Sequence, residues 1–279
     1  MSDLLAKTRE ICQIFEIKPS RTKGQNFLIN EKIYDEIIKA AELEPEETVL
    51  EIGPGLGFLT TKLAAKVKRV VAVELDDKLA AYLQTGFAAQ DAANVEIVNT
   101  DILRFNPARF NNQKYKIVAN LPYNISSIFL RQFLTTPQRP EMMVLMLQKE
   151  VAERITAEPP DMSILAVSIQ YYADAKIIRE VKAGNFWPEP KVDSAIIRIK
   201  VRLESHEAVA DKQFFRLVRT GFSAKRKMLK NNLASGLRIE SAEAEKALVN
   251  LGFDPKTRAE DLSLEDWRKL FVSFRPFMV

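Results

Sequence analysis

The segment TVLEIGPGLG at residues 48–57 decides the fold class of this chain. It begins with a short apolar run typical of a buried strand, and three glycines spaced as G-x-G-x-G follow at once. Glycines at such a position let the backbone turn tightly and approach a ligand with no Cβ in the way. A strand that leads through this kind of loop into a helix is typical of an α/β sheet with a ligand site at its edge.

Strands and helices alternate on both sides of this segment. The expected strands are residues 48–52, 69–73, 95–98, 116–119, 142–147 and 195–199, and the expected helices are residues 4–15, 31–41, 58–65 and 78–83. This alternation indicates a mainly parallel sheet with helices on both faces, as in a Rossmann-like α/β domain. We assign that domain to residues 1–206, including an N-terminal helical extension.

The pattern changes after residue 206, where no further strand is evident. Apolar residues at helical spacing predict helices at residues 214–222, 243–251 and 264–274. Asp211 and Ser241 are plausible N-terminal caps, and Ser263 with Asp266 resembles a capping arrangement. We therefore expect a small all-helical domain at residues 207–279.

The composition excludes several kinds of protein. The chain has 279 residues, 47% of them hydrophobic and 28% charged, as in a globular protein. It has no uninterrupted apolar run long enough for a membrane span, and its first residues lack a secretion signal, so we expect a cytoplasmic protein. Cys12 and His206 are the only residues of their types, which excludes an internal disulfide, a Ser-His-Asp triad and paired-histidine metal sites. We expect no metal, and chemistry that relies on a cofactor or an activated substrate.

The glycine spacing narrows the class of ligand. In the dinucleotide-binding pattern G-x-G-x-x-G, the third glycine would fall at Phe58. The triphosphate-binding pattern G-x-x-x-x-G-K-[ST] is also absent. The observed G-x-G-x-G at Gly53, Gly55 and Gly57 suits a nucleoside ligand without phosphates. S-adenosylmethionine is such a ligand.

Two acidic residues at strand ends support this interpretation. Glu74 closes the second strand of the sheet, where a carboxylate can accept hydrogen bonds from both ribose hydroxyls. Asp101 follows the third strand, where it can accept from an adenine amino group. Each residue has a structural alternative, because Glu74 could cap the helix that begins near Asp77 and Asp101 could hold a turn. The glycine loop and both acids at one edge of the sheet favour the cofactor site.

The tetrapeptide Asn120-Leu121-Pro122-Tyr123 ends the fourth strand and suits methylation of an adenine amino group. That nitrogen is a poor nucleophile, and a base helps little because the neutral amine must attack before it loses a proton. Acceptors that hold its two N–H groups do help, and the Asn120 side-chain oxygen and the Leu121 carbonyl could supply them, with Pro122 fixing the backbone. Tyr123 offers a face on which the base can stack. The alternative is a proline turn with a core tyrosine.

Two aromatic residues precede the last strand. Phe186 or Trp187 could close the other face of the target base, and a buried aromatic residue is the alternative interpretation. A base inside a duplex cannot reach such a pocket. The substrate should therefore be single-stranded, looped or flipped.

Positive charge gathers at two places in the chain, although the net charge of +4 is mild. A dense basic run is either a solvated helix face or a surface for nucleic-acid phosphates. The residues are Arg21 and Lys23 near the N-terminus, and Lys225, Arg226, Lys227 and Lys230 near the C-terminus.

These motifs occur together, in the same order, in a known family. The chain resembles the ribosomal RNA adenine dimethyltransferases, and within them the bacterial small-subunit branch. The matching segments span nearly the whole chain: residues 24–28, 49–60, 73–76, 100–102, 120–127, 186–197 and 222–233.

The resemblance implies two successive methylations on each of two adjacent adenines, in a hairpin loop near the 3′ end of 16S rRNA. The substrate would be the immature small ribosomal subunit, and the enzyme would act as a monomer. Tyr123 and Phe186 would sandwich the target adenine, and residues 222–233 would lie on RNA phosphates. The cofactor site would comprise Gln25, Asn26, Leu28, Gly53, Gly55, Glu74, Asp101, Ile102 and Asn120.

Other functions are compatible with parts of this pattern. A relative that dimethylates large-subunit rRNA and confers macrolide resistance shares the catalytic motifs, but residues 190–194 and 222–233 look like the small-subunit branch. A mitochondrial homologue is disfavoured by the acidic Asp3 and the absence of an Arg-rich leader. A mainly non-catalytic ribosome-assembly factor is the alternative from a different class, and the intact tetrapeptide argues against lost catalysis.

Overall fold

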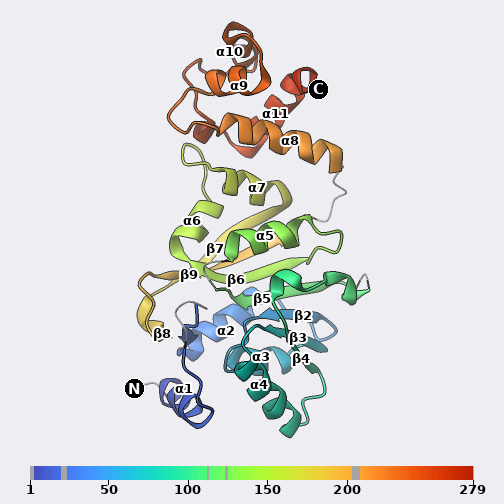
Figure 1. Ribbon diagram of the computed structural model, residues 1–279, viewed down its shortest axis with the longest axis vertical. Coiled ribbons are helices and arrows are strands. Elements are labelled where there is room, and N and C mark those ends of the chain that lie inside the picture. The colour runs from blue at the N-terminus through green and yellow to red at the C-terminus, as the bar shows by residue number, and fades with distance from the viewer. Residues whose placement is uncertain (1–2, 20–23, 112, 123–124, 203–207, 279) are drawn as a thin grey trace. The chain divides into compact units, whose positions relative to one another are not determined.

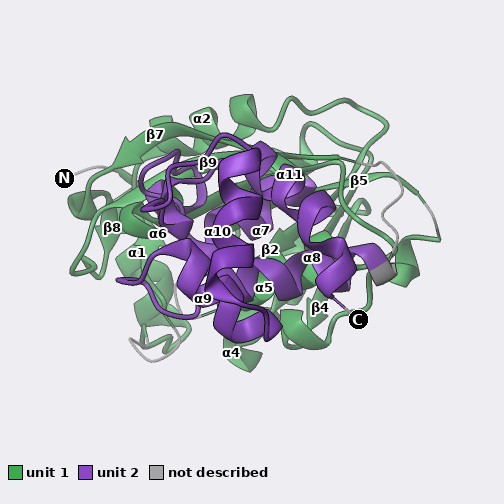
Figure 2. Ribbon diagram, turned by 90° about the horizontal axis from the view of Figure 1, so that it is seen from above, with its two compact units in different colours: residues 1–152, 173–202 green, residues 153–172, 203–279 purple. Residues whose placement is uncertain are grey.

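The computed structural model describes residues 3–19, 24–111, 113–122, 125–202 and 208–278 (Figure 1). The chain divides into two compact units (Figure 2). The first unit comprises Met1–Ala152 with Ala173–Arg202, and the second comprises Glu153–Tyr172 with Leu203–Val279. The sequence placed the domain boundary near residue 206, and the second unit also takes in residues 153–172. The lone His206 lies outside the described residues.

The first unit contains a seven-stranded sheet with the order β4-β3-β2-β5-β6-β9-β7. Neighbouring strands from β4 to β6 are parallel, and β9 runs antiparallel to both β6 and β7, so the expected mainly parallel sheet is confirmed. The strands are β2 (Thr48–Ile52), β3 (Arg69–Glu74), β4 (Val95–Asn99), β5 (Tyr115–Asn120), β6 (Met142–Gln148), β7 (Ala173–Val181) and β9 (Ser194–Val201). The sequence did not predict β7.

Helices and short segments surround this sheet in the first unit. Every residue of β2 is buried, as expected of a parallel strand covered on both faces. The helices are α1 (Asp3–Ile14), α2 (Glu31–Ala40), α3 (Phe58–Ala64), α4 (Asp77–Ala89) and α5 (Ser126–Thr135), with the 3-10 turns η1 (Ile102–Arg104), η2 (Pro107–Phe110) and η3 (Ala183–Asn185). A further helix, α6 (Lys149–Ile155), begins in the first unit and continues into the second. A two-residue strand, β1 (Phe27–Leu28), pairs antiparallel with β8 (Phe186–Trp187). The sequence predicted neither α5 nor this small pair.

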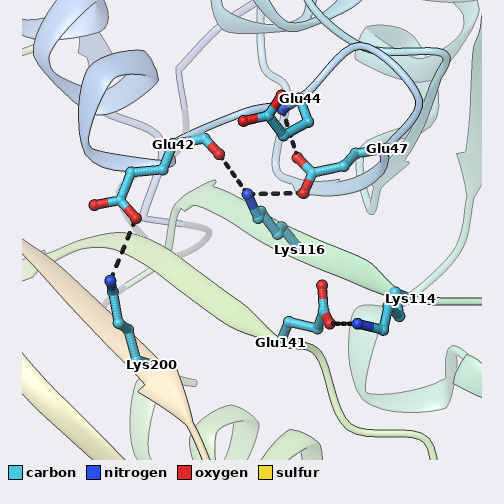
Figure 3. Close-up of polar contacts among 7 residues, drawn as sticks. All are labelled: Glu42, Glu44, Glu47, Lys114, Lys116, Glu141 and Lys200. Carbon is cyan, nitrogen blue, oxygen red and sulfur yellow. Dashed lines mark hydrogen bonds and ion pairs between the residues drawn. The ribbon is translucent and has the colours of Figure 1, made fainter.

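Ion pairs fix the edge of the sheet where the parallel strands begin (Figure 3). Lys116 on β5 is 7% exposed, and its Nζ lies 2.8 Å from Glu47 Oε1 and 2.5 Å from the carbonyl oxygen of Glu42. The other oxygen of Glu47 accepts a hydrogen bond from the backbone N–H of Glu44 at 2.8 Å. Glu42 also pairs with Lys200 on β9 at 3.3 Å. These contacts join the turn before β2 to two other strands, opposite the edge that carries the glycine loop.

The second unit is built from helices around a core of aromatic and aliphatic side chains. Trp267, Phe214 and Phe274 are at most 1% exposed in this core. The helices are α7 (Ile164–Tyr172), α8 (Ala208–Gly221), α9 (Leu229–Leu237), α10 (Ser241–Asn250) and α11 (Leu264–Phe274), with the 3-10 turns η4 (Ala259–Asp261) and η5 (Arg275–Phe277). No helix in the described part of the chain is long and apolar enough to cross a membrane.

The predicted caps in this unit have different outcomes. Ser263 and Asp266 form the expected capping box at the start of α11. Asp211 does not cap a helix, because α8 already begins at Ala208 and the Asp211 carboxylate accepts hydrogen bonds from the hydroxyls of Tyr171 and Tyr172. Ser241 is the first residue of α10 and not its cap, which is Glu240.

Candidate functional site

A cavity of about 330 Å³ lies where the four strands β2, β3, β4 and β5 end. Parallel strands bring their carboxyl ends to one edge of a sheet, so residues distant in sequence meet there. Among the residues predicted for the cofactor site, the cavity is lined by Gln25, Asn26, Gly53, Gly55, Glu74, Asp101, Ile102 and Asn120. Pro122 of the tetrapeptide also lines it.

The glycine loop needs glycine for two physical reasons. Gly53, Gly55 and Gly57 have φ angles of 65°, 58° and 81°, in the left-handed region that side chains disfavour. Space is also short, because a Cβ on Gly55 would come within 3.2 Å of the Phe27 ring. A Cβ on Gly57 would lie 2.8 Å from a methyl carbon of Leu83. The glycine loop is therefore packed tightly against the side chains of Phe27 and Leu83.

Backbone N–H groups hold the carboxylate of Glu74 at the end of β3. Its Oε2 accepts from the Gly55 N–H at 3.3 Å, and its Oε1 accepts from the Asp76 N–H at 2.9 Å. Burial raises the pKa of Glu74, and these N–H donors act to lower it. The alternative that Glu74 caps the next helix is wrong, because Asp76 caps α4 by accepting from Lys78 and Leu79.

Asp101 holds a turn, which was the alternative to a cofactor-binding role considered for it in the sequence. Its Oδ1 accepts from the Leu103 N–H at 2.9 Å and caps η1. This does not remove it from the cavity, which it lines together with Ile102. A carboxylate has two oxygens, and capping uses one of them.

The Asn120 side chain is oriented by the N-terminal segment. Its Nδ2 donates to the carbonyl oxygen of Asn26 at 3.3 Å, which directs the amide nitrogen toward that segment. The Leu121 N–H donates to Met146 on β6 at 3.2 Å, and the Leu121 side chain is 1% exposed. The backbone after β5 is thus fixed up to Pro122. Tyr123 lies outside the described residues.

The N-terminal segment closes one side of the cavity. Gln25 donates to the Asp76 carboxylate at 3.5 Å, and Phe27 lines the cavity beside it. Leu28 and Phe186 face each other across the β1–β8 pair, and they are 1% and 3% exposed in the hydrophobic core. Neither is among the described residues that line the cavity. Trp187 lies against the Arg9 guanidinium, 5.8 Å from the ring centre.

A buried carboxyl group lies directly before the glycine loop. Glu51 on β2 is 1% exposed, and its Oε2 has no hydrogen-bond partner among the described residues. The pKa of Glu51 is raised to about 8; burial is the largest cause, the Thr60 hydroxyl acts in the opposite direction, and the nearby Glu74 adds to the increase. Glu51 was not among the residues predicted for the site.

Leu75 is a cavity residue that the sequence analysis missed. Its side chain is 57% exposed although it is apolar, and it lines the cavity next to Glu74. The signal available in the sequence was a large apolar residue directly after a strand-end acid. Asp76, Thr100 and Ile125 also line the cavity and were not predicted.

The predicted basic residues do not share one environment. Lys225, Arg226 and Lys227 are exposed on the loop between α8 and α9, and not on a helix face. Lys230 differs, because its side chain is 17% exposed and its ammonium pairs with Glu245 at 2.7 Å. This ion pair links Lys230 on α9 to Glu245 on α10. The remaining two, Arg21 and Lys23, lie outside the described residues.

The charges around the cavity have one sign. Its described lining includes the carboxylates of Glu74, Asp76 and Asp101 and no Lys or Arg side chain. Such a lining repels phosphate groups and suits a ligand that carries positive charge. Within the described ranges, no cluster of three or more His, Cys, Asp or Glu residues is placed to hold a metal ion.

Comparisons with known proteins give the family. Residues 18–275 match the family model described as ribosomal RNA adenine dimethylase. The chain is 42% identical to ribosomal RNA small subunit methyltransferase A of Dehalococcoides mccartyi, over 97% of this chain and 94% of that protein. It is 41% identical to the protein of the same name from Clostridium botulinum, over 94% and 96%.

Two solved structures resemble the fold. The 23S rRNA methyltransferase ErmE has a TM-score of 0.75 at 29% identity, covering 90% of this chain and all of that one. A dimethyladenosine transferase from Plasmodium falciparum has a TM-score of 0.77 at 26% identity, covering 90% and 98%. With its predicted glycine loop, strand-end acids and Asn120 assembled around one cavity, this chain belongs to the ribosomal RNA adenine dimethylase family.

Proposed function

We propose that this protein dimethylates the N6 amino groups of two adjacent adenines in the 16S rRNA of the immature small ribosomal subunit. The relatives that support this are named small-subunit methyltransferases and are 41–42% identical over at least 94% of the chain. The large-subunit alternative is supported less, because the 23S enzyme ErmE is 29% identical. We further propose that the enzyme acts as a monomer in the cytoplasm.

The cavity suits S-adenosylmethionine as the methyl donor. The observation that carries this assignment is the lining of three carboxylates without a described cationic side chain, which fits a cationic nucleoside without phosphates. When bound, S-adenosylmethionine supplies a methyl group already activated on a positively charged sulfur. Glu74 would accept from the ribose hydroxyls, and the second oxygen of Asp101 would accept from the adenine amino group.

Asn120 would hold the amino group that is methylated. Because its Nδ2 already donates to Asn26, its Oδ1 is the atom left to accept an N–H of the target adenine. The Leu121 carbonyl would accept the other N–H, since the backbone on either side of it is fixed. Two such acceptors favour a nitrogen whose lone pair points toward the methyl group, which is the geometry that transfer requires.

The target base would enter the cavity in a flipped or single-stranded state. Tyr123 is proposed to stack on one face of the base. Phe186 is covered in the present structure, so its proposed stacking role requires its ring to become exposed when the base binds. The exposed Lys225, Arg226 and Lys227 of the second unit would contact RNA phosphates.

The test is methyl transfer from labelled S-adenosylmethionine to undermethylated small subunits. We expect Asn120→Ala to lower the rate at least about 100-fold, because a preorganised acceptor is lost, while thermal unfolding stays close to that of the wild type. Asn250→Ala, a matched change at an exposed position of α10, should keep the wild-type rate. Equal rates for both variants would contradict the role of Asn120.

A further inference from the structure

One stretch of the first unit is free of acidic residues. Residues 102–140 contain no Asp or Glu and six Lys or Arg residues, whereas the chain average of 37 acids in 279 residues predicts about five acids there. Ordinary surfaces of soluble proteins mix both signs of charge. This stretch runs from η1 through β5 and α5 to the start of β6, so it borders the cavity on the side of Asp101 and Asn120.

Four of these six cations already have partners within the first unit. These contacts tie the four side chains to other parts of the first unit. The pairs are Arg109 with Glu96, Lys114 with Glu141, Lys116 with Glu47, and Arg139 with the carbonyl oxygen of Arg202.

Arg104 and Arg131 are the two that remain. Both are exposed, and neither has an ion pair, hydrogen bond or ring contact from its side chain among the described residues. Each of the other described arginines of the first unit has such a contact: Arg9, Arg69, Arg109, Arg139, Arg179, Arg198 and Arg202. The two free guanidinium groups are therefore not a general property of this surface.

The elements that carry these two arginines lie side by side at the cavity. Arg104 ends η1 directly after Leu103, a cavity residue, and α5 begins directly after Ile125, another cavity residue. The two elements are joined by a hydrogen bond from Gln132 of α5 to the Leu103 carbonyl oxygen at 3.3 Å. Arg104 thus directly follows a cavity residue, and Arg131 lies on the helix that begins at the cavity and is hydrogen-bonded to η1.

An exposed apolar side chain accompanies them. Ile128 is 60% exposed and lies three residues before Arg131 on α5, which places the two on neighbouring positions of one helix face. A small anion would need only the charges. A nucleotide strand offers phosphates to the guanidinium groups and ribose or base surface to an apolar side chain.

We propose that Arg104, Ile128 and Arg131 form a docking surface for the RNA strand that carries the target adenine. The surface binds phosphates next to the flipped nucleotide and so fixes the strand at the mouth of the cavity. This inference rests on the proposed function, because it names RNA as the occupant. It differs from the basic loop at residues 225–227, which belongs to the other compact unit.

The test compares two double variants of equal charge change. Arg104→Gln with Arg131→Gln removes both guanidinium groups, and Lys39→Gln with Lys66→Gln removes two exposed charges that precede strands at the opposite edge of the sheet. Binding to a hairpin RNA of the 16S 3′ end is measured between about 50 and 200 mM salt, and each phosphate contact to a single strand contributes about 0.7 to the slope of log affinity against log salt. Cofactor affinity is measured by calorimetry for both variants.

We expect the arginine double variant to bind the hairpin RNA about ten- to a hundredfold more weakly and to lose about 1.4 from the salt slope. Its affinity for S-adenosylmethionine should be unchanged, and the lysine double variant should match the wild type in all three measurements. Arg104→Lys with Arg131→Lys should keep most of the slope, because it keeps the charges, but recover only part of the affinity.

Two results would overturn the inference while leaving the proposed function in place. One is an arginine double variant with wild-type RNA affinity and salt slope. The other is normal binding to the hairpin combined with slow methylation of whole subunits, which would assign the surface to a ribosomal protein. A wild-type protein that neither binds this RNA nor methylates it would instead overturn the proposed function, and the RNA occupant with it.

Discussion

Replacing Glu51 by glutamine should make the protein less sensitive to alkaline pH. The carboxyl group is buried on β2 directly before the glycine loop, with Oε2 lacking a hydrogen-bond partner among the described residues. Its pKa is raised from 4.5 to about 8, chiefly by burial. Glutamine has nearly the same shape and stays neutral at every pH, so Glu51→Gln removes the titration and keeps the packing.

The sign and size of the effect follow from the two pKa values. Below pH 4.5 the carboxyl group is mostly protonated in both the folded and the unfolded chain, so it does not change the free energy of unfolding. As the pH rises toward 8, the unfolded chain releases the proton while the folded chain keeps it, which favours unfolding. Each pKa unit corresponds to about 1.4 kcal/mol, so the wild type should lose roughly 3 to 4 kcal/mol from this group between pH 5 and pH 8.

Urea unfolding of both proteins at the two pH values measures this quantity. Other titrating groups are shared, so the difference in unfolding free energy between Glu51→Gln and wild type isolates Glu51. That difference should shift in favour of the variant by roughly 3 to 4 kcal/mol from pH 5 to pH 8. Glu46→Gln is the control, because Lys68 lowers the pKa of that exposed group and the shift should not have the same sign. An equal difference for Glu51→Gln at both pH values would refute the reasoning.

Two further predictions concern stability. Gly57→Ala should lower the unfolding free energy by about 1 to 3 kcal/mol, because φ is 81° at this residue and the added Cβ would clash with the Leu83 side chain. Gly86→Ala is the control, since Gly86 lies in α4 with open space around it, and this change should leave the unfolding free energy unchanged or raise it. Equal effects of the two changes in urea unfolding would contradict the role assigned to Gly57. Lys116→Met should cost about 2 kcal/mol, because it leaves the partly buried Glu47 carboxylate without its ion-pair partner. Lys68→Met removes only an exposed pair and should cost much less. The prediction fails if thermal unfolding ranks the two variants the other way.

The parallel part of the fold could be predicted because its strands are buried on both faces and therefore read as apolar runs. β2, β3, β5 and β6 all show this pattern. β7 is different, because it is an edge strand with exposed charged residues and follows α7 with no intervening residue. Its sequence carries neither an apolar run nor a turn signal, and only pairing with β9 identifies it as a strand.

Some residues of the candidate site could likewise be predicted from the sequence, and others could not. Gly53, Glu74, Asp101 and Asn120 could be placed from the sequence because parallel strands deliver their carboxyl ends to one edge. Phe186 could not, since its burial depends on pairing with the segment of β1, more than 150 residues earlier in the chain. Tertiary partners decide such positions, and a single sequence does not show them.

The proposed reaction places two methyl groups on each of two adjacent adenines in small-subunit rRNA. Purified protein, S-adenosylmethionine and undermethylated small and large subunits can be incubated separately, and each rRNA analysed by nuclease digestion and mass spectrometry with primer extension across the candidate hairpins. We predict two neighbouring N6,N6-dimethyladenosines in the hairpin near the 3′ end of 16S rRNA, with no change in the large-subunit rRNA. Methylation of the large-subunit rRNA alone, or of neither RNA under conditions where the cofactor binds, would contradict it.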